Sequence, residues 1–316
     1  MTAPTTVTET VTADVRAALR KQLTAARLDA SELSAMETWL PAGAGVALLR
    51  EWTEQRVRGV PLSRICGRRG FWRDDFVVTK DVLAPRPESE LLVEEALRIL
   101  GHSDGDGDGD KNGDDDNGGV GDGDDDGRND SDSDGDKVCE VVEFGTGCGA
   151  ILLSVLNDNS RARGVGIEKS AAALNVAREN GRRLGLESRV RWLKSDWSDV
   201  VLKRRGGRLA IANPPYLTTA EWRGAMPEVR DYEPRAALDG GADGLAAYRT
   251  LGAAMARALA EGEHALVELT PLRAAETLAA LEAAGFGTRR VLRDLGGRAR
   301  AACLVRGLAS AAGGLL

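Results

Sequence analysis

The sequence Asn213-Pro214-Pro215-Tyr216, which follows the apolar run 208–212, has residue types that can carry chemistry. Proline fixes its φ angle and donates no backbone hydrogen bond, and the residue before a proline is held extended. The four residues should therefore form a stiff, non-helical bracket at the end of a strand. Such a bracket can simply terminate the strand, or it can hold a side-chain amide and an aromatic ring around a ligand.

A second group is the glycine-rich sequence GTGCGA, which runs from Gly145 to Ala150 after the apolar run VVEF. Glycine adopts left-handed backbone angles at little cost and allows a ligand to approach the backbone closely. The loop can be a tight turn without a ligand, or it can bind a nucleoside cofactor or a dinucleotide. The dinucleotide fingerprint normally spaces its glycines as GxGxxG, which differs from the spacing here.

Two other strand-like runs end in acidic residues. Glu168 lies 19 residues after Gly149, where a carboxylate can accept hydrogen bonds from ribose hydroxyls. It can also be a charge at a helix start, because Ser170 follows it. After the third run, Asp196 can accept from an adenine amino group and Trp197 can cover the base. Together these residues favour binding of a nucleoside.

The elements that must position these residues alternate along the chain. Strand-like runs lie at 138–144, 162–168, 189–196, 207–213 and 263–269, and two more strands are expected within 288–307. Helix-like runs separate them, except that the runs at 189–196 and 207–213 are expected as successive strands. Alternation of strands and helices is typical of a parallel sheet with helices on both faces. We therefore predict an α/β fold with a doubly wound, seven-stranded sheet.

The N-terminal part has a different pattern. Residues 12–58 are rich in Ala, Leu, Arg and Glu, with apolar positions at helical spacing, and they predict a small helical domain. Aromatic and β-branched residues around turn signals predict a β-hairpin within 61–85, followed by a helix over 88–100. We expect a helical domain over 1–60 and a second domain, including the hairpin linker, over 61–316.

Composition excludes several classes of function. The chain of 316 residues has no uninterrupted apolar run of membrane-spanning length, and its N-terminus lacks the apolar core of a secretion signal. The four cysteines form no CxxC pair and there are only two histidines, so we expect neither a metal site nor a histidine-based triad. A cytoplasmic protein with reduced thiols is expected.

The net charge of −7 comes from one tract, because residues 101–137 hold 15 of the 49 acidic and 3 of the 42 basic residues. The remainder has 39 basic and 34 acidic residues. Disorder is expected for such an Asp/Gly-rich insertion, since it cannot bury enough apolar surface to offset the loss of entropy on ordering. Weak calcium binding is the alternative, although an EF-hand-like loop needs a glutamate at its twelfth position.

The order of these motifs resembles the class I S-adenosyl-L-methionine-dependent methyltransferases. More narrowly, the chain is similar to the protein-(glutamine-N5) methyltransferases that act on peptide chain release factors, the HemK/PrmC family. The stretches that carry the resemblance are RGVPLSRICGRRGFW, VLAPRPESELLVEEAL, EFGTGCGAI and NPPYLTTAEWRGAMPEVRDYEPRAALDGGADGLAAYR. The resemblance covers roughly residues 55–306 without the acidic tract, and it implies a Rossmann-like methyltransferase sheet with an N-terminal substrate-recognition domain.

The resemblance also implies roles for individual residues. The cofactor S-adenosyl-L-methionine would contact Glu143, Gly145, Thr146, Gly147, Cys148, Gly149, Glu168, Asp196, Trp197 and Asn213. The substrate glutamine would contact Arg86, Asn213, Pro214, Pro215 and Tyr216, with Asn213, Pro214 and Tyr216 as the catalytic group. In this arrangement the Asn213 side-chain oxygen and the Pro214 carbonyl accept the two N–H groups of the target amide, and Tyr216 stacks on its plane.

Three local features depart from the family pattern: the acidic insertion, the sequence ELTPLR at 268–273 and the start of the fourth strand. An ion pair between Glu233 and Arg235 is expected near the substrate mouth.

The partner of this protein is expected to be a release factor, bound by a monomer, without stable binding of nucleic acid. One alternative is an N-methyltransferase for an exocyclic amine of DNA or RNA, which needs a flipped base and a basic groove. Another is a non-catalytic, cofactor-binding protein associated with translation.

Overall fold

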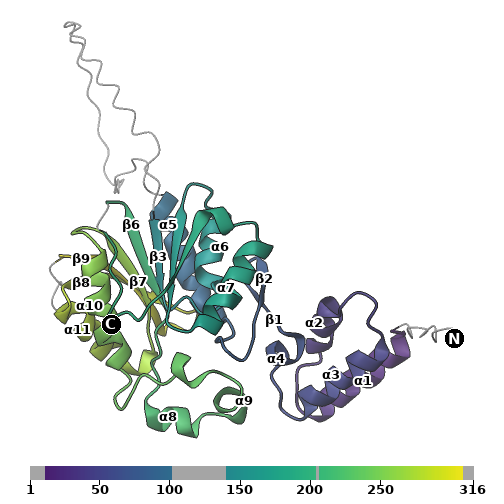
Figure 1. The fold of residues 1–316 in the computed structure, drawn as a ribbon. Helices are drawn as coiled ribbons and strands as arrows, with labels where there is room; N and C mark the ends of the chain where they lie inside the picture. Colours follow the sequence, from purple (N-terminus) through teal and green to yellow (C-terminus); the bar gives the residue numbers. More distant parts are fainter. Residues whose placement is uncertain (1–10, 102–139, 204–205, 309–316) are drawn as a thin grey trace, which may run out of the picture.

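The computed structural model of the chain describes residues 11–101, 140–203 and 206–308. Its centre is a seven-stranded sheet with the strand order β5-β4-β3-β6-β7-β9-β8 (Figure 1). The strands are β3 (Glu140–Phe144), β4 (Arg163–Glu168), β5 (Val190–Lys194), β6 (Arg208–Ala212), β7 (His264–Glu268), β8 (Phe286–Arg293) and β9 (Ala299–Arg306). All neighbours pair in parallel except β9, which is antiparallel to both β7 and β8. This confirms the predicted α/β fold.

Helices cover both faces of the sheet (Figure 1). One layer contains α5 (Glu90–Gly101), α6 (Ala150–Asp158) and α7 (Ala171–Arg183), and the other contains α10 (Ala246–Ala258) and α11 (Ala274–Ala283). Each layer has its own apolar core against the sheet. Every residue of β6 is buried, as expected for a central parallel strand that has helices on both sides. The sheet therefore holds the ends of β3, β4 and β6 in fixed positions.

The N-terminal helices lie to one side of the sheet (Figure 1). They are α1 (Ala13–Ala25), α2 (Glu32–Trp39), α3 (Val46–Val57) and α4 (Leu62–Cys66). Thr12 caps α1, since its side chain accepts a hydrogen bond from the backbone N–H of Val15 at 3.3 Å. Leucines of α1, α2 and α3, together with Met36 and Trp52, form a small core that is separate from those of the sheet.

A hairpin of β1 (Arg68–Phe71) and β2 (Asp74–Val77) follows the N-terminal helices. The hairpin predicted within 61–85 is present, but residues 62–66 form α4, which the sequence pattern did not predict. The helix predicted over 88–100 begins with a 3₁₀ turn, Pro87–Ser89, and continues as α5. Proline is well suited to such a helix start because its missing N–H would have no intrahelical partner there.

A segment between β6 and α10 carries two short helices, α8 (Thr219–Gly224) and α9 (Pro227–Arg230). Thr218 and Glu221 form a reciprocal capping box at the start of α8. The predicted Asp/Gly-rich insertion over 101–137 lies outside the described residues, apart from Gly101 at the end of α5. No helix within the described ranges is both long enough and apolar enough to cross a lipid bilayer.

Candidate active site

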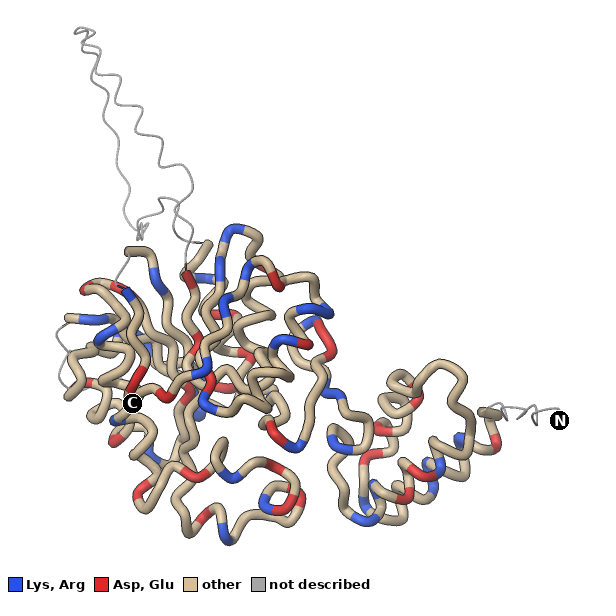
Figure 2. The backbone as a smooth tube through the Cα atoms, in the orientation of Figure 1, with Lys and Arg blue, Asp and Glu red and all other residues tan. Residues whose placement is uncertain are grey.

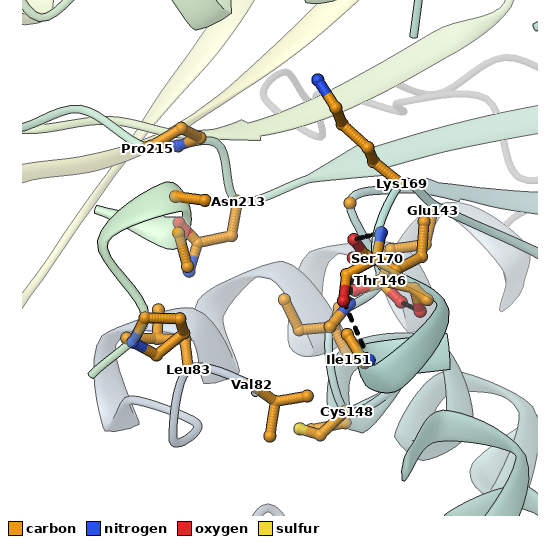
Figure 3. Close-up of a pocket in the computed structure, with 18 of the residues that line it drawn as sticks. Val82, Leu83, Glu143, Thr146, Cys148, Ile151, Lys169, Ser170, Asn213 and Pro215 are labelled. Atoms are coloured by element: carbon orange, nitrogen blue, oxygen red, sulfur yellow. Dashed lines mark hydrogen bonds between the residues drawn. The ribbon is translucent and has the colours of Figure 1, made fainter. Parts of the chain in front are cut away.

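A cavity of about 650 Å³ lies at the carboxyl ends of the parallel strands. Ligands bind at this edge in open α/β sheets, because strand-to-helix loops from neighbouring strands meet there. Figure 3 shows Asn213 and Pro215 on one side of the cavity and Glu143, Thr146 and Ser170 on the other. The predicted site residues that line it are Arg86, Glu143, Gly145, Thr146, Gly147, Cys148, Glu168, Asp196, Trp197, Asn213 and Pro215. Three predicted residues do not line it: Gly149, Pro214 and Tyr216.

The glycine loop connects β3 to α6. Gly145, Gly147 and Gly149 have φ angles of 77°, 55° and 82°, which lie in the left-handed region. A side chain at Gly145 would collide with the ring of Trp197, with 2.9 Å between its Cβ and Cζ2. At Gly147 an added Cβ would meet no protein atom within 4 Å. The backbone therefore needs glycine at both positions, and Gly147 leaves open space beside the cavity.

Glu168, at the end of β4, joins the glycine loop to the start of α7. Its Oε2 accepts from the backbone N–H of Gly147 at 3.0 Å, and its Oε1 accepts from that of Ser170 at 2.8 Å. The contact with Ser170, the N-cap of α7, matches the alternative interpretation of Glu168 as a charge at a helix start. The contact with Gly147 does not. Each carboxylate oxygen can accept a further hydrogen bond, so Glu168 can also bind hydroxyl groups in the cavity.

Asp196 and Trp197 follow β5 on the same side of the cavity. Asp196 Oδ2 lies 2.7 Å from Nζ of Lys169, and the hydrogen bond from this ammonium lowers the pKa of Asp196. Trp197 covers Gly145 and packs on the core beneath α10. The sequence pattern did not predict Lys169 as a partner of Asp196, although the two residues follow neighbouring strands.

Glu143 is the most deeply buried acid on the cavity wall, with 2% of its surface exposed. The hydroxyl of Thr146 donates a hydrogen bond to its Oε2. Burial raises the pKa of Glu143 to about 8, because the charged carboxylate loses its hydration. A cationic group in the cavity would favour ionisation of this carboxyl, so Glu143 is suited to face an ammonium group.

The bracket after β6, residues 213–216, packs closely against a glycine-rich segment that contains Gly240 and Gly244. Pro214 is buried, whereas Asn213, Pro215 and Tyr216 are half-buried. Backbone carbonyls of the bracket press against a glycine-rich segment: a Cβ at Gly240 would lie 2.6 Å from the oxygen of Pro215, and one at Gly244 would lie 2.6 Å from the oxygen of Tyr216. The bracket is therefore held by its own prolines and by close backbone contact.

Two residues that the sequence interpretation missed, Ser89 and Glu268, continue a chain of hydrogen bonds from Asn213 into the protein, and Ser89 also lines the cavity. Asn213 Nδ2 donates to Ser89 Oγ at 3.1 Å, and Ser89 Oγ donates to Glu268 Oε2 at 2.5 Å. Both residues are buried, and burial raises the pKa of Glu268 to about 7. Glu268 ends β7, the strand next to β6, so its position at a strand end was the signal available in the sequence.

Arg86 lines the cavity and also contacts Glu233, with 3.4 Å between Nη2 and Oε1. Glu233 pairs with Arg64 as well, and it accepts from the backbone N–H of Ala84 at 3.2 Å. The predicted ion pair between Glu233 and Arg235 is wrong, since Arg235 pairs with Asp239 instead. Over 11–101, 140–203 and 206–308, no cluster of three or more His, Cys, Asp or Glu residues is placed to hold a metal ion.

Comparisons with known proteins find methyltransferases. The family model "Methyltransferase small domain" matches residues 133–227. A curated protein of Caulobacter vibrioides, named release factor glutamine methyltransferase, is 36% identical over 250 residues, which cover 79% of this chain and 75% of the relative. Proteins of the same name from Agrobacterium fabrum and Xylella fastidiosa strain Temecula1 are 33% and 30% identical. Their matches cover 78% and 82% of this chain, and 75% and 81% of the relatives.

A solved structure with a partly similar fold is that of the hMettl16 catalytic domain in complex with MAT2A 3'UTR hairpin 6. Its TM-score is 0.48 at 11% sequence identity, and the match covers 74% of this chain and 76% of that one.

Proposed function

The chain belongs to the family of release factor glutamine methyltransferases, and on that premise we propose the reaction that its cavity supports. The protein transfers a methyl group from S-adenosyl-L-methionine to the side-chain amide nitrogen of a glutamine in a peptide chain release factor. The N–CH3 bond forms as the S–CH3 bond breaks, S-adenosyl-L-homocysteine leaves, and the nitrogen loses one N–H proton to solvent. The observation that carries the proposal is the position of the Asn213 carboxamide in the cavity wall, across from the glycine loop (Figure 3).

The residues of the cavity fit S-adenosyl-L-methionine. The open space at Gly147 is where its methionine portion can approach the backbone, and Glu143 can face the ammonium group. Glu168 has acceptor capacity for ribose hydroxyls, and Asp196 and Trp197 can bind adenine. When bound, S-adenosyl-L-methionine supplies an electrophilic methyl group on a sulfonium. Gly149 is placed differently from the other glycines, because it is the N-cap of α6 and shapes the loop without lining the cavity.

The protein must position a weak nucleophile, because the lone pair of an amide nitrogen is delocalised into its carbonyl. Asn213 lines the cavity, and its Oδ1 accepts one N–H of the target amide. The Pro214 carbonyl is proposed to accept the other, although Pro214 is buried and does not line the cavity before the substrate binds. Two acceptors localise electron density on the nitrogen and fix its direction. Correct positioning of this kind contributes several kcal/mol, and up to about 7–11 kcal/mol in favourable cases. Pro215 and Arg86 complete the substrate side of the cavity.

Tyr216 ends the bracket and is proposed to stack on the target amide, although it does not line the cavity before the substrate binds. Its ring packs at the edge of the core beneath α10, and its carbonyl accepts from Arg273 Nη2 at 3.3 Å. Burial, reinforced by the nearby Glu268, raises the pKa of Tyr216 to about 12. Its hydroxyl therefore stays protonated at physiological pH and does not act as a base in this mechanism.

We propose that residues 1–60 recognise the release factor and that residues 61–316 form the catalytic domain. An ion pair supports a link between the two parts: Nη1 of Arg56, on α3, lies 2.7 Å from Oε1 of Glu228, on α9. The segment that carries α8 and α9 continues to Pro234, Ala236 and Ala237, which line the cavity. A protein seated on the N-terminal helices would therefore reach the cavity mouth. The proposed form is a cytoplasmic monomer.

Acidic and basic residues are mixed over the N-terminal helices and over the segment of α8 and α9 (Figure 2). A surface of mixed charge is suited to a protein partner, whereas binding to nucleic acid depends on many contacts from basic residues to phosphates. We therefore propose a protein substrate and no stable complex with nucleic acid.

The test is transfer of a labelled methyl group from S-adenosyl-L-methionine to a purified release factor, to duplex DNA or to ribosomal RNA. Label in the release factor, located by mass spectrometry on one glutamine and lost when that glutamine is replaced by asparagine, is the expected result. Label in DNA or RNA alone would instead establish the nucleic-acid alternative. Binding of S-adenosyl-L-methionine without transfer to any of the three would contradict the proposed enzyme activity.

A further inference from the structure

Three polar side chains from distant segments form a chain of hydrogen bonds that begins at the cavity wall, which Asn213 and Ser89 both line. Asn213 follows β6, Ser89 belongs to the 3₁₀ turn before α5, and Glu268 ends β7. The bonds run from Asn213 Nδ2 to Ser89 Oγ, 3.1 Å, and from Ser89 Oγ to Glu268 Oε2, 2.5 Å. Ser89 and Glu268 are 2% and 4% exposed, so solvent cannot readily replace either contact.

The direction of this chain is set at its buried end. At a pH where Glu268 is ionised, its carboxylate accepts hydrogen bonds but cannot donate one, so the Ser89 hydroxyl must donate a hydrogen bond to Glu268. The Ser89 oxygen is then available to Asn213 only as an acceptor, and an amide nitrogen is the group of Asn213 that can donate. The oxygen Oδ1 is consequently left without a role in this chain. Rotation of the carboxamide by 180° would bring two acceptors face to face.

We propose that Ser89 and Glu268 are positioning residues that hold the Asn213 carboxamide with its nitrogen turned away from the target amide and its oxygen available to accept from it. This inference rests on the proposed function and deepens it, because it explains what fixes the acceptor that the reaction needs. Neither residue transfers a group to the substrate. Glu268 acts through Ser89, and Ser89 acts through Asn213.

Glu268 is also held from its backbone side. The hydroxyl of Tyr248, on α10, donates to the carbonyl oxygen of Glu268 at 2.9 Å. Tyr248 is fully buried and makes this contact without touching Ser89 or Asn213 through a hydrogen bond. It therefore offers a matched control, since Tyr248→Phe removes one buried hydrogen bond at Glu268 and leaves the polar chain complete.

The chain predicts a dependence of the rate on pH. Burial raises the pKa of Glu268 to about 7, and Glu88, Arg86, Arg300, Tyr216 and Tyr248 are the other titratable groups that act on this carboxyl or adjoin it. Above this pH the carboxylate enforces the direction of the chain. Below it, a protonated Glu268 can donate to Ser89, whose hydroxyl is then free to donate to Asn213 Oδ1. The transfer rate should accordingly fall as the pH decreases through about 7.

The kinetic test compares Ser89→Ala, Glu268→Gln, Ser89→Thr and Tyr248→Phe with the wild type, using a release factor and saturating S-adenosyl-L-methionine. Ser89→Ala and Glu268→Gln should lower kcat by about 10–100-fold, as is typical when a group that orients an active-site side chain is lost. The dissociation constant for S-adenosyl-L-methionine should stay within about twofold, because neither residue is among the groups proposed to bind it. Ser89→Thr should retain most of the rate, because it keeps the hydroxyl.

Glu268→Gln should also abolish the decline of kcat near pH 7, whereas Tyr248→Phe should keep both the rate and the pH profile of the wild type. If Glu268 had only a structural role, Glu268→Gln would lower the melting temperature but would keep the decline of kcat below about pH 7. If Glu268→Gln does not fold, Ser89→Ala decides, since it removes a single buried hydroxyl. A wild-type kcat in Ser89→Ala would overturn the inference while leaving the proposed function intact.

A second measurement does not depend on activity. In protein labelled with ¹⁵N-asparagine, the side-chain amide signals of Asn213 are those that disappear in Asn213→Ala. These signals should shift with pH around 7 in the wild type and stop doing so in Glu268→Gln. If the wild type methylates no release factor, the proposed function fails, and this titration still decides the inference. Asn213 signals that are unaffected by pH and by Ser89→Ala would overturn it.

Discussion

Asn213 is the residue on which the proposed reaction depends most, because its side chain reaches the cavity and is also hydrogen-bonded from behind. A free asparagine side chain would sample two orientations of its amide, and only one presents an acceptor to the substrate. The contact with Ser89 distinguishes nitrogen from oxygen, and the two prolines that follow restrict the backbone. The Asn213 carboxamide is therefore already oriented to accept a hydrogen bond from the target amide before the substrate binds.

We predict that Asn213→Ala lowers the rate of methyl transfer by about 10²-fold or more, the usual loss for one preorganised polar group. Its affinity for S-adenosyl-L-methionine should remain close to that of the wild type, because the carboxamide mainly serves the target amide. Single-turnover kinetics and calorimetry measure the two quantities separately. Turnover near the wild-type rate would contradict the role of the carboxamide as an acceptor.

Glu168 is the second residue whose role can be isolated. It supports the glycine loop through Gly147 and has acceptor capacity left for ribose hydroxyls. We expect Glu168→Ala to weaken binding of S-adenosyl-L-methionine by about 1.5–3 kcal/mol, the range for hydrogen bonds to charged groups. Glu168→Gln, which keeps one acceptor oxygen, should lose less. Equal affinity in Glu168→Ala and the wild type, measured by calorimetry, would place the ribose elsewhere.

At the scale of elements, the loop between β3 and α6 shows how backbone geometry makes room for a ligand. Its glycines adopt left-handed angles that lead the chain from the strand into the helix, and Gly147 exposes backbone to the cavity. Gly185, after α7, has a comparable φ angle of 70° and equally open surroundings, but it does not line the cavity. The two glycines therefore differ mainly in that Gly147 lines the cavity and Gly185 does not.

Alanine at Gly147 should cost about 1–2 kcal/mol of folding free energy because of the left-handed backbone, and alanine at Gly185 should cost about the same. Only Gly147→Ala should weaken S-adenosyl-L-methionine binding, by about tenfold or more, which corresponds to about 1.4 kcal/mol. Urea unfolding and calorimetry on both variants make the comparison. Equal affinities for the two variants would show that the methionine portion does not approach Gly147.

At the scale of the whole molecule, Glu233 connects three parts of the chain. Its carboxylate pairs with Arg64 of α4 and with Arg86 at the cavity, and it binds the backbone N–H of Ala84. The side chains of Arg64 and Glu233 are 7% and 3% exposed. Because Glu233 follows α9, it ties the N-terminal helices, the cavity wall and the segment at the mouth to one another.

Breaking a buried ion pair by removing one partner leaves the other charge without compensation, which costs about 3–5 kcal/mol. We expect a loss of this size in the free energy of unfolding of Glu233→Ala, together with a lower rate of methyl transfer, since the residues around Ala84 line the cavity. The control is Glu179→Ala, which removes an exposed pair with Arg182 and should change stability by about 0–1 kcal/mol. Chemical denaturation that gives similar losses for both variants would refute the connecting role of Glu233.

The order of the main strands and helices could be predicted from the sequence, and most of the predicted site residues do line the cavity. Alternating apolar runs specify strands and helices locally, and motifs such as GTGCGA and Asn213-Pro214-Pro215-Tyr216 constrain the backbone through glycine and proline. Parallel strands place their carboxyl ends at one edge, so residues that follow different strands were expected to converge. Local chemistry was sufficient for these predictions, because each depends on neighbours within a few positions.

Contacts between side chains that are distant in the sequence could not be predicted from it. Asn213 meets Ser89 across 124 residues of sequence, and Ser89 meets Glu268 across 179, because β6 and β7 are neighbours in the sheet and the turn before α5 contacts both. The choice of Arg64 rather than Arg235 as the partner of Glu233 has the same cause. Charge and spacing leave many pairings equally favourable, and the packing of helices on the sheet selects one of them.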